Sequence, residues 1–289
     1  MANLKDIKRR IRSVESTMQI TKAMELVASS KLRRARERAE ASQPFFEQTY
    51  KLMSEIAAED PYFDSQFVRP RTEKGSAILI VIAGDRGLAG GFNANVLRLT
   101  QQRIGELKEQ GCEAVVLPIG QKAVDHFAAR GAKVLGSYDH IAEHMSIYLA
   151  MDMAELVLSA YRRHSSVQSV EIVFTNYVSP LVQEAQCMQV IPLTQLAGSH
   201  PRRCAVEYEP SPEAVFEKLV PQYVSGLLYG AVVESFASEQ AARRTAMENA
   251  TDNATEMIDQ LSLQYNRARQ GAITQELTEI VGGANALEG

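Results

Sequence analysis

The chain begins with a long segment in which small or apolar residues recur at alternating steps of four and three. From Asn3 to about Glu59 there is no glycine, and Pro44 is the only proline. The recurring positions are Ile7, Ile11, Val14, Met18, Thr21, Glu25, Ala28, Leu32, Ala35 and Ala39. This heptad spacing is typical of a coiled-coil helix. At about 1.5 Å per residue, such a helix is a long rod that needs another helix to pack against.

A second helical segment begins at Pro212, where Ser211 and Pro212 are a typical helix start with Glu213 in the first turn. Small residues dominate its seam and allow close packing against the alanine-rich half of the first seam. The seam positions are Phe236, Arg243, Met247, Ala250, Ala254, Met257, Leu261, Tyr265, Ala268 and Ala272. We therefore predict that residues from about 3 to 58 and from about 212 to 285 form one antiparallel coiled coil, with Ala28 opposite Ala250 or in a nearby register.

Between these segments, strand and helix patterns alternate. The expected strands are SAILIVIA, EAVVLPI, AKVLGSY, QSVEIVFTNYV and EAQCMQVIPL, and the expected helices are Asn93–Gln110, QKAVDHFAAR and Ala142–His164. Strands separated by helices imply a mostly parallel sheet with helices on its faces, and the last two strands predict a hairpin at one edge.

The predicted fold class is α/β, with a Rossmann-like domain inserted between two coiled-coil helices. The expected boundaries are 1–60 for the N-terminal helix, 61–75 for a linker, 76–210 for the α/β domain and 211–289 for the C-terminal helix.

A glycine-rich turn, GDRGLAGGFN, follows the first expected strand. Strand, glycine loop and helix together are the layout of a phosphate cradle. However, Gly84, Gly87, Gly90 and Gly91 match neither G-x-G-x-x-G nor G-x-x-x-x-G-K-[ST], and no Lys-Ser or Lys-Thr follows the loop. We interpret the loop as a tight turn that needs positive φ.

Composition narrows the class of protein. An apolar fraction of 45% and a charged fraction of 23% are typical of a soluble globular chain, and the net charge of −4 gives no overall polyanion-binding character. The charge is uneven along the chain, since residues 1–40 hold eleven Lys or Arg and five acids.

The cysteines and histidines predict no metal site. The three cysteines form no C-x-x-C pair, and His140 and His144, four apart on an expected helix, have no nearby third ligand. No apolar run is long enough to span a membrane, and the start lacks a signal peptide, so we expect a cytosolic position.

Four segments carry a resemblance to a known family: ITKAMELVASSKLRRA, GDRGLAGGFN, YEPSPEAVFEKLVPQYV, and the C-terminal run from ESFASEQAARRTAMENATDNATEMIDQL onward. In this order they resemble the gamma subunit of bacterial F-type ATP synthase, the central rotor shaft. The resemblance implies a non-catalytic chain whose coiled coil stands in an alpha3-beta3 hexamer and whose α/β domain sits on the membrane rotor (c) ring, at the cytoplasmic face of the bacterial cell membrane. The epsilon subunit is an implied partner. No cofactor or metal is expected on this chain, because Mg-ATP or ADP belongs to the alpha and beta partners.

The resemblance also implies partner contacts. Those with alpha and beta loops are Met24, Lys31, Arg33, Arg34, Arg36, Arg243, Arg269, Gln270, Thr274 and Glu276; those with the rotor ring are Tyr208 and Glu209. Lys31, Arg33, Arg34 and Arg36 form what we call the basic collar. From the residues alone the collar is a solvated helix face, and whether Asp85 and Arg86 also meet a neighbouring subunit stays open.

Two other hypotheses remain. One is a nucleotide-binding α/β enzyme with a coiled-coil appendage, which the missing phosphate fingerprint weakens. The other is a coiled-coil nucleic-acid binder, which the negative net charge and the absence of aromatic residues among the collar bases disfavour. We therefore expect no nucleic-acid partner.

Overall fold

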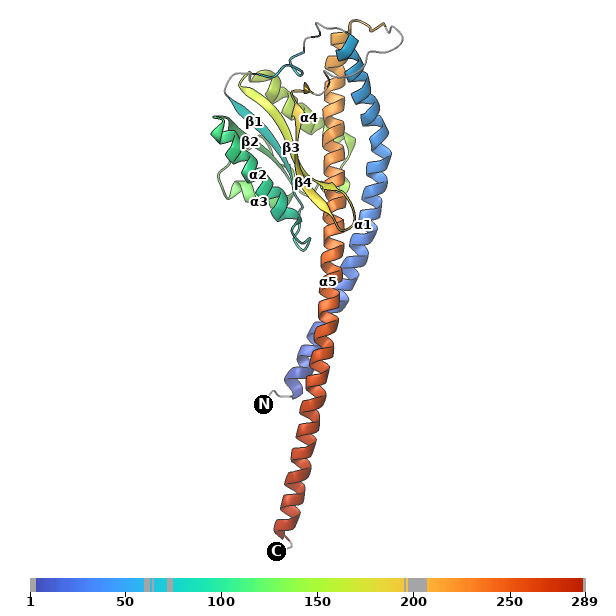
Figure 1. Ribbon diagram of the computed structural model, residues 1–289, viewed down its shortest axis with the longest axis vertical. Coiled ribbons are helices and arrows are strands. Elements are labelled where there is room, and N and C mark those ends of the chain that lie inside the picture. The colour runs from blue at the N-terminus through green and yellow to red at the C-terminus, as the bar shows by residue number, and fades with distance from the viewer. Residues whose placement is uncertain are drawn as a thin grey trace. The chain divides into compact units, whose positions relative to one another are not determined.

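The computed structural model describes residues 4–59, 63, 65–71, 75–194, 196 and 207–287, except for the side chains of residues 59 and 283–287. In chain order, the elements are α1 (Leu4–Glu59), β1 (Ser76–Ile82), α2 (Phe92–Glu109), β2 (Glu113–Ile119), α3 (Gln121–Ala128), η1 (Ala142–His144), α4 (Ile147–Arg163), β3 (Val167–Tyr177), β4 (Gln183–Ile191) and α5 (Pro212–Leu287) (Figure 1). Contacts divide the chain into two compact units. The first joins the chain up to Ala28 with the chain from Arg244, and the second is Ser29–Arg243.

The second unit contains a four-stranded sheet in the order β2-β1-β3-β4. Strand β1 pairs parallel with β2 and β3, and β3 pairs antiparallel with β4. Parallel neighbours need crossover connections, which α2 and the segment containing α3 and α4 supply. The mostly parallel sheet and the edge hairpin predicted from the sequence are both confirmed.

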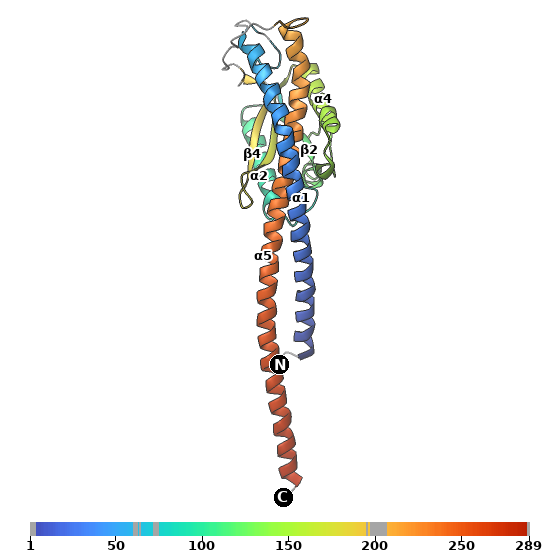
Figure 2. The same ribbon diagram turned by 90° about the vertical axis from the view of Figure 1, so that its right-hand side faces the viewer.

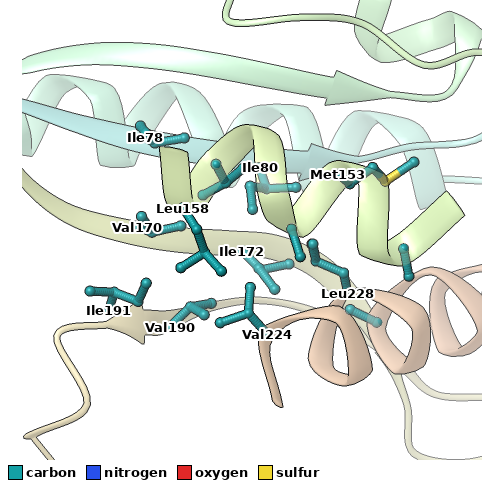
Figure 3. Packing of buried hydrophobic residues seen from close by; sticks show 14 of the residues in the cluster. Ile78, Ile80, Met153, Leu158, Val170, Ile172, Val190, Ile191, Val224 and Leu228 are labelled. Atoms are coloured by element: carbon teal, nitrogen blue, oxygen red, sulfur yellow. The ribbon is translucent and has the colours of Figure 1, made fainter. Parts of the chain in front are cut away.

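The apolar run of β1 is buried on both faces of the sheet. Ile78 and Ile80 belong to a core cluster that includes α4 and α5. Leu79 and Val81 belong to a second cluster with α2 and α3. Figure 3 shows the first layer, where side chains of α4 and α5 turn toward the strands. Burying an apolar side chain stabilises the fold by roughly 1.5–3 kcal/mol. Because both faces of β1 are covered, every position along the strand favours an apolar residue, which explains its unbroken apolar sequence.

Within the second unit, α1 packs along its predicted seam, whereas α5 uses two alanines that lie off the seam predicted for it. Leu32 and Ala35 of α1 form a buried cluster with Ala237 and Ala241 of α5. The prediction that small residues let these helices approach closely is confirmed.

Within the first unit, the two chain ends lie side by side and antiparallel (Figures 1 and 2). Thr21 and Ala28 are buried on α1, and Met247 and Ala254 are buried on α5. The Oγ1 atoms of Thr21 and Thr251 lie 2.8 Å apart in a hydrogen bond.

Two details of the predicted seams are wrong. Thr21, and not Ala28, lies opposite the turn of α5 that contains Ala250, because its hydroxyl bonds to Thr251. Met257 is 51% exposed although the heptad pattern places it in the seam. Heptad spacing predicts which face of each helix is buried but not which turns of the two helices lie opposite each other, so it does not fix the register.

The predicted strand AKVLGSY is also wrong. This segment makes only isolated parallel bridges, from Val134 to Val116 and from Tyr138 to Ile119. Pro118 of β2 accepts from the amide of Tyr138 but has no N–H to donate back, which interrupts the ladder on this side.

The predicted helix Ala142–His164 is two elements. A 3₁₀ turn covers Ala142–His144, and α4 begins only at Ile147. Ser146, in an extended conformation, caps α4 by accepting from the amide of Leu149 at 3.3 Å.

The described part of the expected linker 61–75 packs within the second unit, against α4 and β3. Phe67 is fully buried in the core. The Nη1 of Arg71 donates to the backbone carbonyl groups of Tyr161, His164 and Val167 at 2.8–2.9 Å. This segment therefore ties α4 and β3 together. Among the described residues, no helix has an apolar stretch long enough to cross a bilayer.

Candidate functional site

The glycine loop is held by its own side chains. Oδ1 of Asp85 accepts from the backbone amides of Gln121 at 3.0 Å and His140 at 2.9 Å. The amide of Gly84 donates to Oδ1 of Asn93 at 2.8 Å. A carboxylate in the middle of the loop would repel a phosphate, so the arrangement is that of a structural turn. Positive φ occurs at Gly90, as predicted for the loop, but also at Leu88, with φ of 54° and 60°.

Arg243 and Glu239 of α5 lie against this loop. Arg243 donates to the carbonyl oxygen of Gly87 at 3.2 Å and pairs with Glu239 one helical turn earlier. Their side chains are 11% and 6% exposed. Burial raises the pKa of Glu239, and the charge of Arg243 opposes that rise. The guanidinium predicted to meet a partner is thus already bound within the chain.

The basic collar is split between two environments. Nζ of Lys31 pairs with Glu143 at 2.6 Å, and the Arg36 guanidinium lies 5.3 Å from the ring centroid of Tyr177. Arg33 and Arg34 are exposed, and the nearest acid to Arg33 is Glu37 at 4.0 Å on the same helix. Lys31 and Arg36 therefore contact other elements of the second unit, whereas Arg33 and Arg34 are exposed and have no such contact among the described residues.

Met24 lies half-buried in the first unit beside an apolar surface that sequence reasoning missed. Ile20, Leu26 and Val27 on the same stretch of α1 are 58%, 62% and 54% exposed. The sequence does contain a sign of this surface, because these large apolar residues lie off the heptad seam, at positions where a two-helix coiled coil exposes its side chains. Large apolar side chains exposed together indicate a surface that another chain covers.

The end of α5 is exposed throughout. Every residue from 271 to 282 is exposed, and so are Arg269 and Gln270. The hydroxyl of Thr274 donates to the carbonyl oxygen of Gln270 at 2.9 Å, within the helix. The four predicted contact residues here, Arg269, Gln270, Thr274 and Glu276, lie beside the exposed apolar residues Ile273, Leu277, Ile280 and Val281.

The two predicted ring-contact residues differ in exposure. Tyr208 packs partly buried against the main core cluster, whereas Glu209 is exposed. Whether either residue meets the rotor ring stays a prediction. The helix start predicted after them is confirmed, because α5 begins at Pro212 and Ser211 Oγ accepts from the amide of Ala214 at 3.2 Å.

A buried ion pair in the sheet was not predicted. Glu171 of β3 accepts two hydrogen bonds from Arg103 of α2, at 2.8 and 2.9 Å, and one from the thiol of Cys187 at 3.2 Å. Burial raises the pKa of Glu171, but the hydrogen bonds from Arg103 and Cys187 outweigh it and leave the pKa below its usual value. A single acid inside the apolar run VEIVF was the available signal. The thiol of Cys187 donates to Glu171, and burial raises the pKa of this thiol to about 12, so the cluster is a set of hydrogen bonds between α2, β3 and β4.

The histidine interpretation needs correction. His140 is not helical, since its φ is +55°, and His144 ends the 3₁₀ turn. In the part of the chain that the structure describes, no three His, Cys, Asp or Glu side chains gather in a way that could hold a metal ion.

Sequence comparison places the chain in a family. The sequence model of the family described as ATP synthase matches residues 3–287. An ATP synthase gamma chain from Ruminococcus albus is 53% identical over 280 residues, which cover 97% of this chain and 97% of that relative. A gamma chain from Acetobacterium woodii, named as sodium ion specific, is 44% identical over 304 residues and covers 99% of each.

Solved structures show the same fold at low sequence identity. The rotor of Euglena gracilis mitochondrial ATP synthase contains a chain with a TM-score of 0.66 and 19% identity, covering 93% of this chain and 98% of that one. A chain in the central stalk and c-ring structure of the Tetrahymena thermophila enzyme has a TM-score of 0.59 and 23% identity, covering 80% of this chain and 99% of that one. With the family match over nearly the whole sequence, these observations lead to one conclusion: the chain belongs to the ATP synthase gamma chain family.

Proposed function

We propose that this gamma chain is the central rotor shaft of an F-type ATP synthase and couples rotation of the membrane ring to conformational change at the catalytic beta subunits. It performs no bond chemistry itself. Magnesium and adenine nucleotides are held by the alpha and beta subunits. The family membership supports this assignment, and the chain's own surfaces indicate how it works.

The observation that carries the proposal is the exposed end of α5. Residues 271–282 continue as a helix although each of them is exposed. An isolated helix end with large apolar residues such as Leu277 and Ile280 is unfavourable in water. A surrounding sleeve of other subunits, such as an alpha3-beta3 hexamer, would cover it.

The first unit also presents different kinds of exposed side chain on different sides of the helix pair. The exposed apolar residues Ile20, Leu26 and Val27 lie on the same stretch of α1 as Met24, and Arg269 and Gln270 lie on α5. In the second unit, Arg33 and Arg34 are free to face acidic loops. An asymmetric surface binds three equivalent beta subunits differently, so each rotational angle favours a different nucleotide affinity. That coupling free energy acts in both directions, so nucleotide binding also drives rotation.

The α/β body supplies the other partners. We infer that its exposed Glu209 meets polar loops of the c ring and that the epsilon subunit joins the stalk. The complex would lie at the cytoplasmic face of the bacterial cell membrane, with this chain attached only through the ring.

Reconstitution tests the proposal. An ATP synthase assembled without its gamma chain, then supplied with this chain, should recover ATP-driven ion pumping, and the native complex should contain alpha, beta, epsilon and ring subunits by mass. The isolated chain should hydrolyse no ATP. Hydrolysis that follows the isolated chain through purification, or failure to restore pumping, would contradict the proposal.

A further inference from the structure

We propose that the glycine loop is a socket that anchors α5 to the α/β body through Arg243 and Glu239, and that torque passes between the helix and the body through this anchor. The inference rests on the proposed shaft function. It gives Arg243 a positioning role inside the chain, in place of a contact with a partner subunit.

The anchor is a set of contacts between segments far apart in the sequence. Arg243 donates to the carbonyl oxygen of Gly87 and pairs with Glu239, so one guanidinium joins the loop to two turns of α5. Both side chains are almost fully buried. Removing one member of a buried pair leaves the other charge uncompensated, so the pair strongly favours this one arrangement.

Gly84 makes the close approach of α5 possible. A Cβ atom at position 84 would lie 2.8 Å from the Glu239 carboxyl group, closer than real Cβ atoms come to a neighbour. By contrast, a Cβ at Gly87 would meet nothing within 4 Å. Two glycines of the same loop therefore differ sharply: one faces the ion pair and the other faces open space.

The loop itself is fixed to the body. Asp85 accepts from the amide of Gln121, which begins α3, and from the amide of His140. Asn93 of α2 binds the amide of Gly84 and donates to the carbonyl oxygen of Arg86. A force applied to α5 at Arg243 thus reaches the carboxyl end of β1 and the starts of α2 and α3.

α5 is also held to the sheet, because the amide of Thr175 in β3 donates to Oγ of Ser235 at 3.0 Å and the hydroxyl of Ser238 donates to the carbonyl oxygen of Thr175 at 3.1 Å. Those bonds fix α5 on β3, whereas Arg243 joins α5 to the glycine loop.

Next to the anchor, α5 meets α1 through Ala237 and Ala241 against Leu32 and Ala35. Small apolar side chains pack without direction and resist sliding weakly, whereas hydrogen bonds fix one position. Arg243 is also the last residue of the second unit.

Hydrogen exchange of the full-length chain gives the first test. Arg243→Met removes the guanidinium donors and keeps a long unbranched side chain. Gly84→Ala displaces the carboxyl group of Glu239 while keeping the charges of both Arg243 and Glu239. Both should accelerate exchange of the loop amides at least tenfold without loss of helix content. Gly105→Ala in α2, where an added Cβ would meet nothing within 4 Å, and Arg244→Gln are the matched controls and should leave the loop unchanged. Equal loop exchange in wild type and Gly84→Ala would overturn the anchor. Should Arg243→Met not fold, Gly84→Ala carries the test.

The reconstituted complex gives the second test, as ions pumped per ATP hydrolysed. The anchor predicts at least a twofold lower ratio for both Arg243→Met and Gly84→Ala, with both controls at the wild-type value. A loss confined to Arg243→Met would show that Arg243 acts on a partner subunit and would overturn the anchor. A wild-type chain that restores no pumping would contradict the proposed function instead, so the two failures are distinguishable.

Discussion

Replacing Gly226 by alanine should destabilise the second unit, because α5 passes very close to α1 at this residue. A Cβ atom on Gly226 would lie 2.2 Å from both Cδ1 and Cε1 of Phe46, whereas an ordinary contact is 3.4–4 Å. The Phe46 ring must therefore move, and its centroid lies 5.6 Å from that of Phe45 and 6.5 Å from that of Tyr229, so the move would disturb both ring contacts.

Two opposing terms set the magnitude. Overpacking of this kind costs about 1–3 kcal/mol. Alanine in place of glycine inside a helix returns about 1 kcal/mol. We expect a net loss of about 1 kcal/mol, which lowers the melting temperature of a unit this size by about 2–4 °C.

Urea unfolding followed by circular dichroism measures the change. Gly271→Ala, in the same helix, is the matched control: a Cβ there meets nothing within 4 Å, so the unfolding midpoint of the second unit should not fall. The double variant Gly226→Ala with Phe46→Leu should recover part of the loss, because leucine leaves room for the methyl group. If Gly226→Ala is as stable as Gly271→Ala, the close approach of α5 to α1 has no energetic cost. If the effects of Gly226→Ala and Phe46→Leu on stability are additive, the contact with Phe46 is not the cause of the loss.

Three further predictions concern other parts of the chain. The folded chain holds the pKa of Glu171 below its ordinary value of 4.5, so the ionised carboxylate stabilises the fold above pH 4.5 and this stabilisation is lost as the pH falls through the lowered pKa. In an acid titration the free energy of unfolding should therefore fall less steeply for Glu171→Gln than for the wild type. Identical pH dependence in the two proteins would contradict this role of Glu171. Changing Arg33 and Arg34 together to glutamine should leave the melting temperature nearly unchanged, since exposed charges contribute about 0–1 kcal/mol. In the complex the change should reduce the number of ions pumped per ATP, and the reduction should be smaller at high salt than at low salt. Unchanged pumping would mean that the two arginines form a solvated helix face. Cysteines in place of Thr21 and Thr251 should form a disulfide within one chain on oxidation, because the two hydroxyl oxygens lie 2.8 Å apart, and only inter-chain products on a denaturing gel would refute the antiparallel register.

Much of the fold follows from local patterns. The heptad spacing of Thr21 and Ala28 predicted a buried seam, and the apolar run of β1 predicted a strand covered on both faces. Ser211 followed by proline predicted where α5 begins. These features depend only on which face of a short segment is apolar, or on one cap, so neighbouring residues contain the information.

Partner surfaces were less accessible to sequence reasoning. The collar was predicted as one group of bases, but the structure divides it, because Lys31 finds Glu143 112 residues later and Arg33 finds no acid beyond its own helix turn among the described residues. Arg243 was predicted as a partner contact, and only the fold brings it to Gly87, 156 residues earlier. Whether it also meets another subunit stays a prediction.

The sequence by itself determined the long helices, four of the five expected strands, the hairpin and the family. Tertiary structure alone decided the register of Thr21 against Thr251, the missing ladder beside Pro118, the burial of Glu171 with Arg103, and the engagement of the glycine loop by α5. The reason is physical. A periodic pattern records which side of a segment avoids water, but burial is non-directional and accepts many partners. Hydrogen bonds and close approaches select one partner, and that choice exists only when distant segments are packed together.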